Sequence, residues 1–283
     1  MLDLSDRPEL RLLSLVVRAL RVEGGVTECL LVGATARDIQ LELQYGIQVI
    51  RATKDMDFAV AVPDWPTFLR IREALLASNL FQVRGKALHA LTFMASTLVD
   101  LIPFGGVVRP DLTIAWPPDQ DPVMTLIAYP EAWQTSLTVR LPEGETLQVI
   151  SVPALAILKL VAWRDRRHST QGKDAEDLWL LLRNYLEAGQ MERLYEEGMH
   201  LFDQADFDLD RAGAWLLGKD ARQVLDLGEN HQATLAVLCQ ILEPETDPDG
   251  PLCFVTDMVP TRLELGLELL TAFHAGLTGR SNP

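Results

Sequence analysis

The amino-acid sequence predicts an α+β fold, with a mixed sheet and flanking helices followed by a C-terminal helical domain. At 283 residues and 31.5 kDa the chain is long enough for one large domain or two ordinary ones. Up to about residue 150, short strand-like apolar runs alternate with helical patterns. From Val152 onward, apolar residues recur every 3 to 4 positions in a Leu- and Ala-rich sequence, the helical period of about 3.6. We therefore predict domains at 1–150 and 151–283.

The N-terminal domain begins with a helix. Residues 8–22 place leucines and valines at helical spacing, and Gly24-Gly25 ends the pattern. The apolar run 28–32 has the length of a short buried strand. A helix over 35–45 and a strand over 57–62 follow it.

The second part of this domain is mostly β in type. Pro63-Asp64-Trp65-Pro66 combines turn and capping residues, and therefore begins a helix that runs to about Ser78. Gly85-Lys86 separates two further strand-like runs, and Gly105-Gly106 closes a third. We expect these strands at 81–84, 89–94 and 98–104, and a hairpin made of 135–141 and 146–150.

The C-terminal domain is predicted to be helical throughout. Its apolar residues follow the period of 3.6, and strand signals are few. The segment from Glu243 to Pro251 is acidic and contains proline, so we expect an exposed loop there. We expect helices at 153–166, 174–188, 190–202, 208–216, 221–227, 230–242 and 258–276.

The charge and composition limit the function classes. The net charge of −15 and the pI near 4.7 favour solubility and repel polyanions. Both values argue against a protein that binds nucleic acid without sequence preference, because such proteins are usually basic. A nucleic-acid substrate that docks on a local basic patch remains compatible with the sequence.

The chain also has the features of a cytoplasmic protein. No apolar run approaches the length of a membrane span, so we expect no membrane partner. The first residues include Asp3, Asp6 and Glu9, which is unlike the basic start of a signal peptide. The odd number and wide separation of the cysteines favour buried free thiols in a reducing compartment over a disulfide framework or a metal site. These cysteines are Cys29, Cys239 and Cys253.

A small-residue turn after the strand 28–32 is the first candidate site. The sequence Val32-Gly33-Ala34-Thr35-Ala36-Arg37-Asp38 predicts a strand, a tight turn and a helix start, which direct backbone amides toward one point. Gly33 permits close approach of a phosphate, and Thr35 can bind that phosphate or cap the helix. Arg37 can bind a phosphate or pair with a carboxylate, so an ordinary capped helix with an ion pair is the alternative.

A pair of aspartates follows on the next strand. Asp55 and Asp57 are two residues apart, and therefore point to the same face of a strand. Asp100 lies within an apolar β-type run, where an unpaired carboxylate is costly, and is the candidate third acid. Carboxylate oxygens are ligands that Mg²⁺ prefers, so the three acids indicate a site for Mg²⁺ or Mn²⁺. The alternative is a solvated strand start with Lys54 as ionic partner.

The third candidate is the start of the helical domain. Lys159 lies in an apolar helical run, so its ammonium needs water or an acid. Asp174 lies on the apolar face of the following helix, where a carboxylate is either paired or functional. The alternative is a solvated segment in which Lys173 pairs with Asp177. The basic residues of the segment, which offer a local site for triphosphate or RNA, are Lys159, Arg164, Arg166, Arg167 and Lys173.

These motifs in this order resemble the nucleotidyltransferase superfamily of the DNA polymerase β type. The resemblance is greatest to the AbiEii-like branch that includes the MenT toxins, and it spans residues 28–182. The family turn corresponds to Gly33-Ala34 and the family Asp-x-Asp to Asp55-Met56-Asp57. The family lysine corresponds to Lys159, and its Lys-Asp-x-x-Asp-Leu helix start to 173–178. The string from Gly33 to Asp38 also resembles the Gly-Gly-x-x-Arg-Asp of tRNA CCA-adding enzymes.

The resemblance implies a fold, a reaction and a set of roles. The fold is the nucleotidyltransferase sheet, and the reaction is attack on the α-phosphate of a nucleoside triphosphate with release of pyrophosphate. Asp55 and Asp57 would hold one metal ion, and Asp100 would share the second and act as base. Lys159 would neutralise triphosphate charge, and Asp174 would fix Lys159 or the acceptor, so the helical domain would contribute both to the cleft.

The resemblance leaves the acceptor open. In the branch, acceptors are tRNA 3′ ends or partner proteins, and a toxin-like enzyme that modifies tRNA and has a cognate antitoxin is the favoured interpretation. Transfer to a protein or a small molecule is the alternative within the enzyme class. A weakly active or inactive relative that binds nucleotide or a partner is the alternative outside it. Ala34 and the acidic net charge motivate that last alternative. Many family members have serine or glycine at the position of Ala34.

Overall fold

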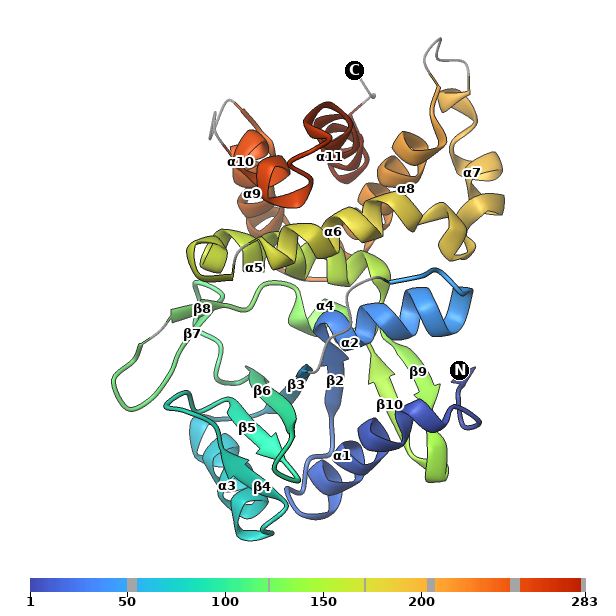
Figure 1. The fold of residues 1–283 in the computed structure, drawn as a ribbon. Coiled ribbons are helices and arrows are strands. Elements are labelled where there is room, and N and C mark those ends of the chain that lie inside the picture. The colour runs from blue at the N-terminus through green and yellow to red at the C-terminus, as the bar shows by residue number, and fades with distance from the viewer. Residues whose placement is uncertain (50–54, 122, 171, 203–206, 245–249, 281–283) are drawn as a thin grey trace. The chain divides into compact units, whose positions relative to one another are not determined.

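A computed structural model describes residues 1–49, 55–121, 123–170, 172–202, 207–244 and 250–280 (Figure 1). The chain divides into two compact units, and each is described by itself. The first comprises Met1–Ile39 and Val49–Ser151, and the second comprises Gln40–Gln48 and Val152–Pro283. The predicted boundary near residue 151 lies at this division, but the segment Gln40–Gln48, which we placed in the first domain, clusters with the second unit.

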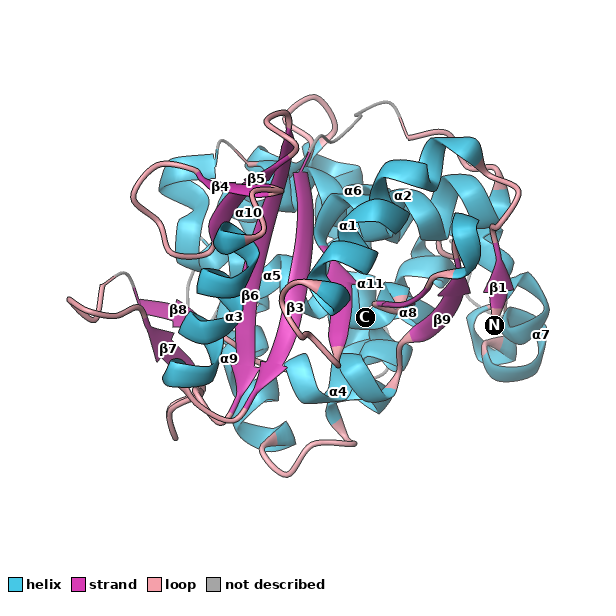
Figure 2. Cartoon of the chain, turned by 90° about the horizontal axis from the view of Figure 1, so that it is seen from below, coloured by secondary structure: helices cyan, strands magenta, loops and turns pink. Residues whose placement is uncertain are grey.

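The first unit is built on an eight-stranded mixed sheet with the order β1-β9-β10-β2-β3-β6-β5-β4 (Figure 2). β3 lies in the middle, antiparallel to β2 and parallel to β6. A separate two-stranded sheet pairs β7 with β8. The strands of the main sheet are β1 (Leu2–Asp3), β2 (Cys29–Val32), β3 (Asp55–Val62), β4 (Phe81–Val83), β5 (Ala90–Phe93), β6 (Thr97–Gly105), β9 (Leu137–Arg140) and β10 (Thr146–Val149). β7 spans Thr113–Ala115 and β8 spans Val123–Thr125.

The neighbouring strands β3 and β6 have one mainly buried face and one face with half-buried residues. On β3, Phe58, Val60 and Val62 point to one face and are at most 4% exposed. Asp55 and Asp57 point to the other face and are half-buried. Because side chains alternate along a strand, this pattern separates a hydrophobic core on one face from polar groups on the other.

The end of helix α1 (Arg11–Val22) lies close to helix α3 (Trp65–Ala77) in the first unit. Gly24, just after α1, lies so close to α3 that an added Cβ would be 2.9 Å from the Leu75 side chain. α3 begins as the sequence predicts, because the Asp64 carboxylate accepts a hydrogen bond of 2.7 Å from the Thr67 amide. The short helix α4 (Tyr129–Gln134) packs beside β6 through the rings of Phe104 and Tyr129.

The elements of the first unit agree closely with the predictions. The predicted strands at 28–32, 57–62, 81–84, 89–94 and 98–104 correspond to β2 to β6, and the predicted hairpin corresponds to β9 and β10. The predicted helix at 35–45 begins at Gly33 as α2 (Gly33–Asp38), and continues as a π-helical segment over Ile39–Leu43. The short elements β1, β7, β8 and α4 were not predicted, because two to six residues carry too little periodicity.

The second unit is helical in all its described elements. Two helix predictions were wrong. The segments 208–216 and 221–227 are parts of a single helix, α8. The helix expected at 258–276 begins only at Leu263, as α11, and it follows a helix that was not predicted, α10. The predicted exposed loop extended to Pro251, but Gly250 and Pro251 are buried at the start of α10. The helices are α5 (Val152–Thr170), α6 (Lys173–Asn184), α7 (Met191–Glu197), α8 (Leu209–Leu225), α9 (His231–Leu242), α10 (Gly250–Met258) and α11 (Leu263–Thr278).

The core of the second unit depends on the close approach of α8 and α11. A Cβ added to Gly218 would lie 1.9 Å from the Phe273 carbonyl oxygen, and one added to Gly276 would lie 2.0 Å from the Trp215 carbonyl oxygen. A small residue at each position therefore brings the two helix backbones into direct contact. This close packing explains why residues 217–220 continue as helix although glycine has a low helix propensity.

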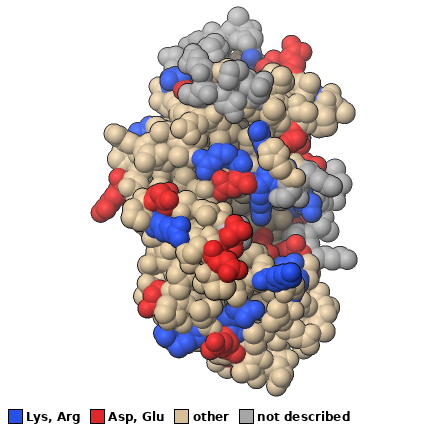
Figure 3. Space-filling model, turned by 90° about the vertical axis from the view of Figure 1, so that its left-hand side faces the viewer, with Lys and Arg blue, Asp and Glu red and all other residues tan. Residues whose placement is uncertain are grey.

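The three cysteines differ in their exposure to solvent. The three cysteines form no disulfide, but only Cys29 is buried. Cys239 is half-buried and Cys253 is exposed, so the prediction of three buried thiols was wrong. Burial raises the pKa of Cys29 to about 11. Acidic and basic side chains are interspersed on the face drawn in Figure 3. Among the described residues, no helix is both long and apolar enough to cross a membrane.

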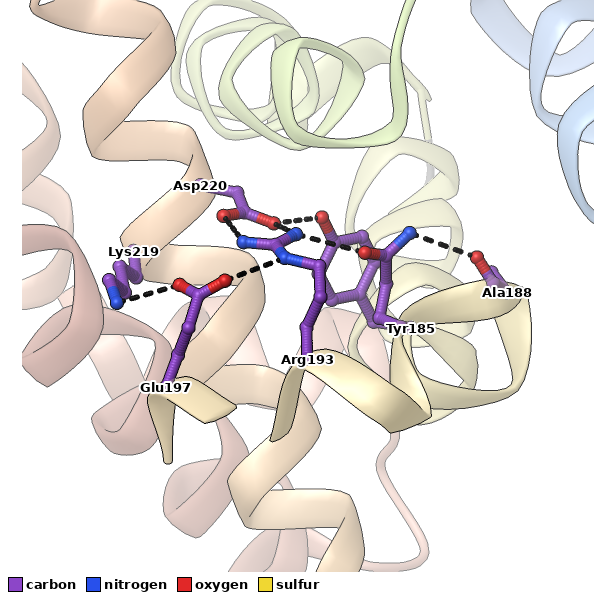
Figure 4. A network of polar contacts seen from close by, with 7 residues as sticks. Tyr185, Ala188, Arg193, Glu197, Lys219 and Asp220 are labelled. Atoms are coloured by element: carbon purple, nitrogen blue, oxygen red, sulfur yellow. Dashed lines mark hydrogen bonds and ion pairs between the residues drawn. The ribbon is translucent and has the colours of Figure 1, made fainter. Parts of the chain in front are cut away.

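A network of charged side chains joins α7 and α8 with Tyr185 in the second unit (Figure 4). The Arg193 guanidinium donates to both oxygens of Asp220 at 2.6 and 2.7 Å, and also to Glu197 at 2.8 Å. The Tyr185 hydroxyl donates to the same Asp220 carboxylate. Lys219 contacts Glu197 at 2.7 Å. Hydrogen bonds from Arg193 and Lys219 lower the pKa of Glu197 to about 2, so this carboxylate is charged at neutral pH.

We predict that Asp220→Asn lowers the free energy of unfolding by about 3 kcal/mol, because it leaves the Arg193 guanidinium without its bidentate partner. Urea unfolding measures the change. Asp226→Asn is the matched control, because Asp226 pairs with Arg222 on the same helix at 46% side-chain exposure. We expect the control to lose about 0.5 kcal/mol or less. Equal losses in the two variants would show that the network does not stabilise the unit.

Candidate active site

The strand β2, the Gly33 turn and α2 bring the chain to the half-exposed face of the sheet. β2 is buried along its whole length, as its Cys-Leu-Leu-Val sequence predicts. Gly33 follows at φ +71°, a left-handed conformation that glycine adopts without strain. The change of direction at Gly33 starts α2 directly beside β3.

Gly33 and the Asp57 side chain are in close contact. A Cβ added to Gly33 would lie 2.1 Å from Asp57 Oδ2, which is less than any real contact. Val32 and Asp57 are paired residues of the antiparallel strands β2 and β3, so the strand register causes this approach. The glycine is therefore required both by its backbone conformation and by the carboxylate beside it.

The sheet brings the three predicted acids to one face. Asp57 is paired with Asp100 across the parallel strands β3 and β6, where neighbouring strands lie about 4.8 Å apart. Asp55 is paired with Leu98, two residues before Asp100, so its side chain points to the same face. All three aspartates are half-buried. The sequence predicted the pair on β3, and the register of β6 adds Asp100 to it.

Arg84, which sequence reasoning missed, pairs with Asp100. It follows β4, and its guanidinium donates a hydrogen bond to Asp100 Oδ1. An arginine therefore compensates the charge of the Asp100 carboxylate in this structure. The sequence predicted a metal ion, and not an arginine, as the partner of Asp100. Arg84 Nε is buried and has no hydrogen-bond partner among the described residues. No local pattern reveals this pair, because 16 positions and a strand turn separate its members.

The residues of the turn have structural partners. The Thr35 hydroxyl donates a 2.8 Å hydrogen bond to the Asp55 carbonyl oxygen, and thereby links α2 to the start of β3. Thr35 does not cap the helix, because the residue at the N-cap is Val32 and no side chain caps it. Arg37 is fully buried and donates to Asp38 Oδ1 from Nε at 2.8 Å. The ion pair that the sequence left open for Arg37 is thus present, and its contact with a nucleotide stays a prediction. Ala34 is half-buried. Lys54 lies outside the described residues.

A second charged cluster lies within the helical unit, between α5 and α6. Lys159 Nζ is 3.1 Å from Asp174 Oδ1 and 2.5 Å from Asp177 Oδ2. Arg166 forms two further hydrogen bonds of 2.8 Å with the two oxygens of Asp174. The side chains of Lys159, Asp174 and Asp177 are at most 8% exposed. The need of Lys159 for an acidic partner is confirmed. Asp177, which the alternative interpretation paired with Lys173, contacts Lys159.

Burial and charge act on Asp174 in opposite directions. Burial by itself raises the pKa of this carboxyl, but the charge of Lys159 and the hydrogen bonds and charge of Arg166 outweigh it. The pKa of Asp174 therefore lies below its usual value of 3.8. Asp174 is thus a charged partner of both Lys159 and Arg166 at neutral pH. Lys159 and Asp174 belong to the second unit, and the three aspartates belong to the first. That they contribute to one cleft stays a prediction.

The comparison with known families decides what this chain is related to. It matches the family model described as nucleotidyl transferase AbiEii toxin, type IV toxin–antitoxin (TA) system, over residues 15–223. The chain belongs to this family. The match confirms the predicted family, the nucleotidyltransferase-like α+β fold and, at the level of class, a toxin-type nucleotidyltransferase. No curated protein matches the chain.

The AbiEii match also covers both charged clusters. The interval 15–223 includes the Gly33 turn, the three aspartates, and the Lys159 cluster. It ends within α8, so α9, α10 and α11 lie outside the matched region. A pocket of about 210 Å³ in the first unit contains none of the predicted site residues; it is lined by Arg21, Thr27, Glu28, Cys29, Trp133, Thr138, Thr146, Leu147 and Gln148.

We predict that Gly33→Ala disrupts the Asp57 position in addition to straining the turn. Gly25→Ala is the matched control, because Gly25 has a similar φ of +66° but nothing within 4 Å of an added Cβ. We expect the control to lose about 1–2 kcal/mol from backbone strain alone. Gly33→Ala should lose clearly more in the same urea unfolding measurement. Equal losses would show that the Asp57 carboxylate moves away without cost.

We predict that Asp174→Asn lowers the free energy of unfolding by about 3 kcal/mol at neutral pH, because it removes the shared partner of Lys159 and Arg166. Asp174 has a lowered pKa when folded, so its stabilisation is complete above the unfolded value of 3.8 and disappears as the pH falls through the folded value. The difference in the free energy of unfolding between wild type and variant should therefore shrink only below about pH 3.8.

Urea unfolding at a series of pH values from about 7 to about 2 tests this prediction. Asp165→Asn is the control, because Asp165 pairs with its neighbour Arg164 on the surface. The control should change the stability by about 0.5 kcal/mol or less at every pH. A difference for Asp174→Asn that is already lost at pH 5 to 6 would contradict the lowered pKa.

Proposed function

We propose that this protein transfers a nucleoside monophosphate from a nucleoside triphosphate to an acceptor, and that the half-exposed face of β3 and β6 is the reaction site. The observation that carries the proposal is the register of the sheet, which pairs Asp57 with Asp100 and places Asp55 on the same face. The family match to nucleotidyl transferase toxins supports the same reaction. Three carboxylates beside a glycine turn meet the needs of a metal-assisted attack on a phosphate.

The donor set of the site fits Mg²⁺ or Mn²⁺. Asp55, Asp57 and Asp100 supply hard carboxylate oxygens on one sheet face, and Mg²⁺ binds through one or two carboxylates together with substrate phosphates. When bound, the metal would supply charge stabilisation at the α-phosphate and lower the pKa of an acceptor hydroxyl. We propose Asp55 and Asp57 as ligands on the nucleotide side, and Asp100 as a ligand and proton acceptor on the acceptor side.

The protein's own groups prepare this arrangement. Thr35 holds the start of β3 by its bond to the Asp55 carbonyl oxygen, so it orients the first acid. Arg84 offsets part of the repulsion between three adjacent carboxylates by pairing with Asp100. We propose that its Nε, a buried donor, meets a phosphate oxygen or the acceptor. We also propose that the amides of Gly33 and Ala34 bind phosphate; Ala34 offers no hydroxyl for this purpose.

Lys159 is proposed to neutralise triphosphate charge. A lysine ammonium has three N–H donors, and Asp174 and Asp177 accept from two directions. The third donor is the group that we propose for a phosphate oxygen. The two acids then act as positioning residues, which hold the ammonium at a fixed place on α5.

The acceptor is proposed to be a tRNA 3′ end, and the toxin class suggests a cognate antitoxin that restrains the activity. The net charge of −15 implies that an RNA acceptor docks on a local basic patch rather than on the surface as a whole. The dense basic residues around Lys159 to Lys173 supply the candidate patch. Transfer to a protein or a small molecule uses the same carboxylates, and is the alternative outcome of the acceptor test.

We predict that Asp57→Asn lowers nucleotide incorporation by about a hundredfold or more, because it removes charge that stabilises the transition state. Purified protein is incubated with each labelled triphosphate, Mg²⁺ and total tRNA, and labelled product is measured. Asp111→Asn is the matched control, because Asp111 is an exposed acid of the same unit that bonds only locally to Thr113 in the contacts observed. Unchanged incorporation by the Asp57 variant would refute the assignment.

The same assay distinguishes the acceptors. Label that appears in tRNA and disappears when the 3′ end is blocked supports the tRNA proposal. Label found only in protein or in a small molecule would transfer the proposal to that acceptor class. Tight binding of nucleotide with Mg²⁺ in calorimetry, without any release of pyrophosphate, would identify an inactive relative.

A further inference from the structure

Three side chains of different chemistry converge in the second unit, outside the region that the family match covers. Cys239 lies on α9, Glu243 follows the end of that helix, and His274 lies on α11. Cys239 Sγ is 3.6 Å from His274 Nε2, and Glu243 Oε1 is 3.4 Å from the same nitrogen. One donor atom of each residue lies within 4.8 Å of the other two.

These separations match the edges of a tetrahedron around a zinc ion. With Zn–S bonds of about 2.3 Å and Zn–N and Zn–O bonds of about 2.0–2.1 Å, tetrahedral geometry separates sulfur from nitrogen by about 3.6 Å and nitrogen from oxygen by about 3.4 Å. The observed separations are 3.6 and 3.4 Å. Two of the three edges therefore match, and the third, between Cys239 Sγ and the Glu243 carboxylate, is at most 4.8 Å.

The geometry differs from that of a catalytic triad. In a Cys-His-acid triad, one ring nitrogen of the histidine faces the thiol and the other faces the acid. Here the same atom, His274 Nε2, faces both Cys239 and Glu243. This arrangement cannot relay a proton from thiol to carboxylate through the ring, but it does direct three donors toward a common point.

We propose that Cys239, Glu243 and His274 bind a zinc ion, with solvent as the fourth ligand. Thiolate, imidazole and carboxylate are the ligand types of protein zinc sites, and three protein ligands with one open position are a known coordination pattern. The ligands come from two helices, 35 residues apart between Cys239 and His274. The ion therefore joins the end of α9 to α11.

This site differs in chemical preference from the aspartates of the sheet. Mg²⁺ prefers oxygen ligands alone, whereas a thiolate favours zinc and other soft or borderline ions. The side chains of His274 and Glu243 are 13% and 15% exposed, so the site is enclosed but reachable by an ion. The Arg280 guanidinium contacts Glu243 Oε1 at 3.0 Å and is itself 64% exposed. It is a cation that competes with the metal for this oxygen.

Binding of Co²⁺ as a spectroscopic probe tests the proposal, because a thiolate ligand gives a charge-transfer band and tetrahedral coordination gives intense visible bands. The full-length protein is freed of metal with a chelator and then titrated with Co²⁺ and Zn²⁺ separately. We expect one equivalent of Zn²⁺ to displace Co²⁺ and abolish the bands. Asp57→Asn should leave them unchanged, which separates this site from the proposed reaction site.

Matched variants assign the ligands. Cys239→Ser should abolish the charge-transfer band, and Glu243→Gln and His274→Gln should weaken zinc binding by about tenfold or more. Cys253→Ser is the control for the first, because Cys253 is an exposed thiol of the same unit. His231→Gln is the control for the last, because the His231 ring contacts only the Gly228 carbonyl oxygen in the contacts observed. Both controls should bind as wild type.

Arg280→Gln provides a test of opposite sign. Removal of the competing cation should leave binding unchanged or increase the zinc affinity severalfold. Absence of the charge-transfer band in wild type, or its persistence in Cys239→Ser, would overturn the proposal. Circular dichroism of each variant shows that the helices are intact, and a variant that fails to fold is replaced by alkylation of Cys239 in the presence and absence of Zn²⁺. Protection of this thiol by zinc supports the site, and equal reactivity overturns it.

Discussion

The position of β3 between β2 and β6 is the constraint on which the rest of the first unit depends. One register with β2 pairs Val32 with Asp57, and one register with β6 pairs Asp57 with Asp100. A shift by a single residue would turn the aspartates into the core and the buried Phe58 and Val60 toward the half-exposed face. The hydrophobic face of the sheet therefore fixes the place of the acids, although it does not touch them.

In each of the two units, buried charges are compensated by partners of opposite sign. In the first unit, Arg84 pairs with one of three adjacent carboxylates, and Arg37 pairs with Asp38 in the interior. In the second, Lys159 and Arg166 share Asp174. Each buried charge thus has a partner of opposite sign, because a buried unpaired charge destabilises a protein strongly. On the proposed function, a nucleotide with bound metal would enter a site whose negative charge Arg84 balances only in part.

Most of the first unit could be predicted from local patterns, because apolar runs of 4 to 9 residues between glycines and prolines specify strands well. The errors have local physical causes. Residues 217–220 form helix because Gly218 lets α8 meet α11 closely, a contact that no local pattern reveals. The start of α10 at Gly250 is buried although its composition is that of a loop. Cys253 is exposed on that helix although its neighbours are apolar.

The sequence by itself determined the family, the α+β class, the aspartate pair on one strand face and the need of Lys159 for an acid. Each of these follows from spacing within a few residues or from the order of short motifs. Only the tertiary structure decided that Asp100 stands beside Asp57 and that Arg84 pairs with Asp100. It also decided that Asp177 contacts Lys159 in addition to Asp174. It alone brought Cys239 and Glu243 to His274. The reason is that strand register and helix packing join residues that are distant in the chain, and side-chain periodicity carries no information about their partners.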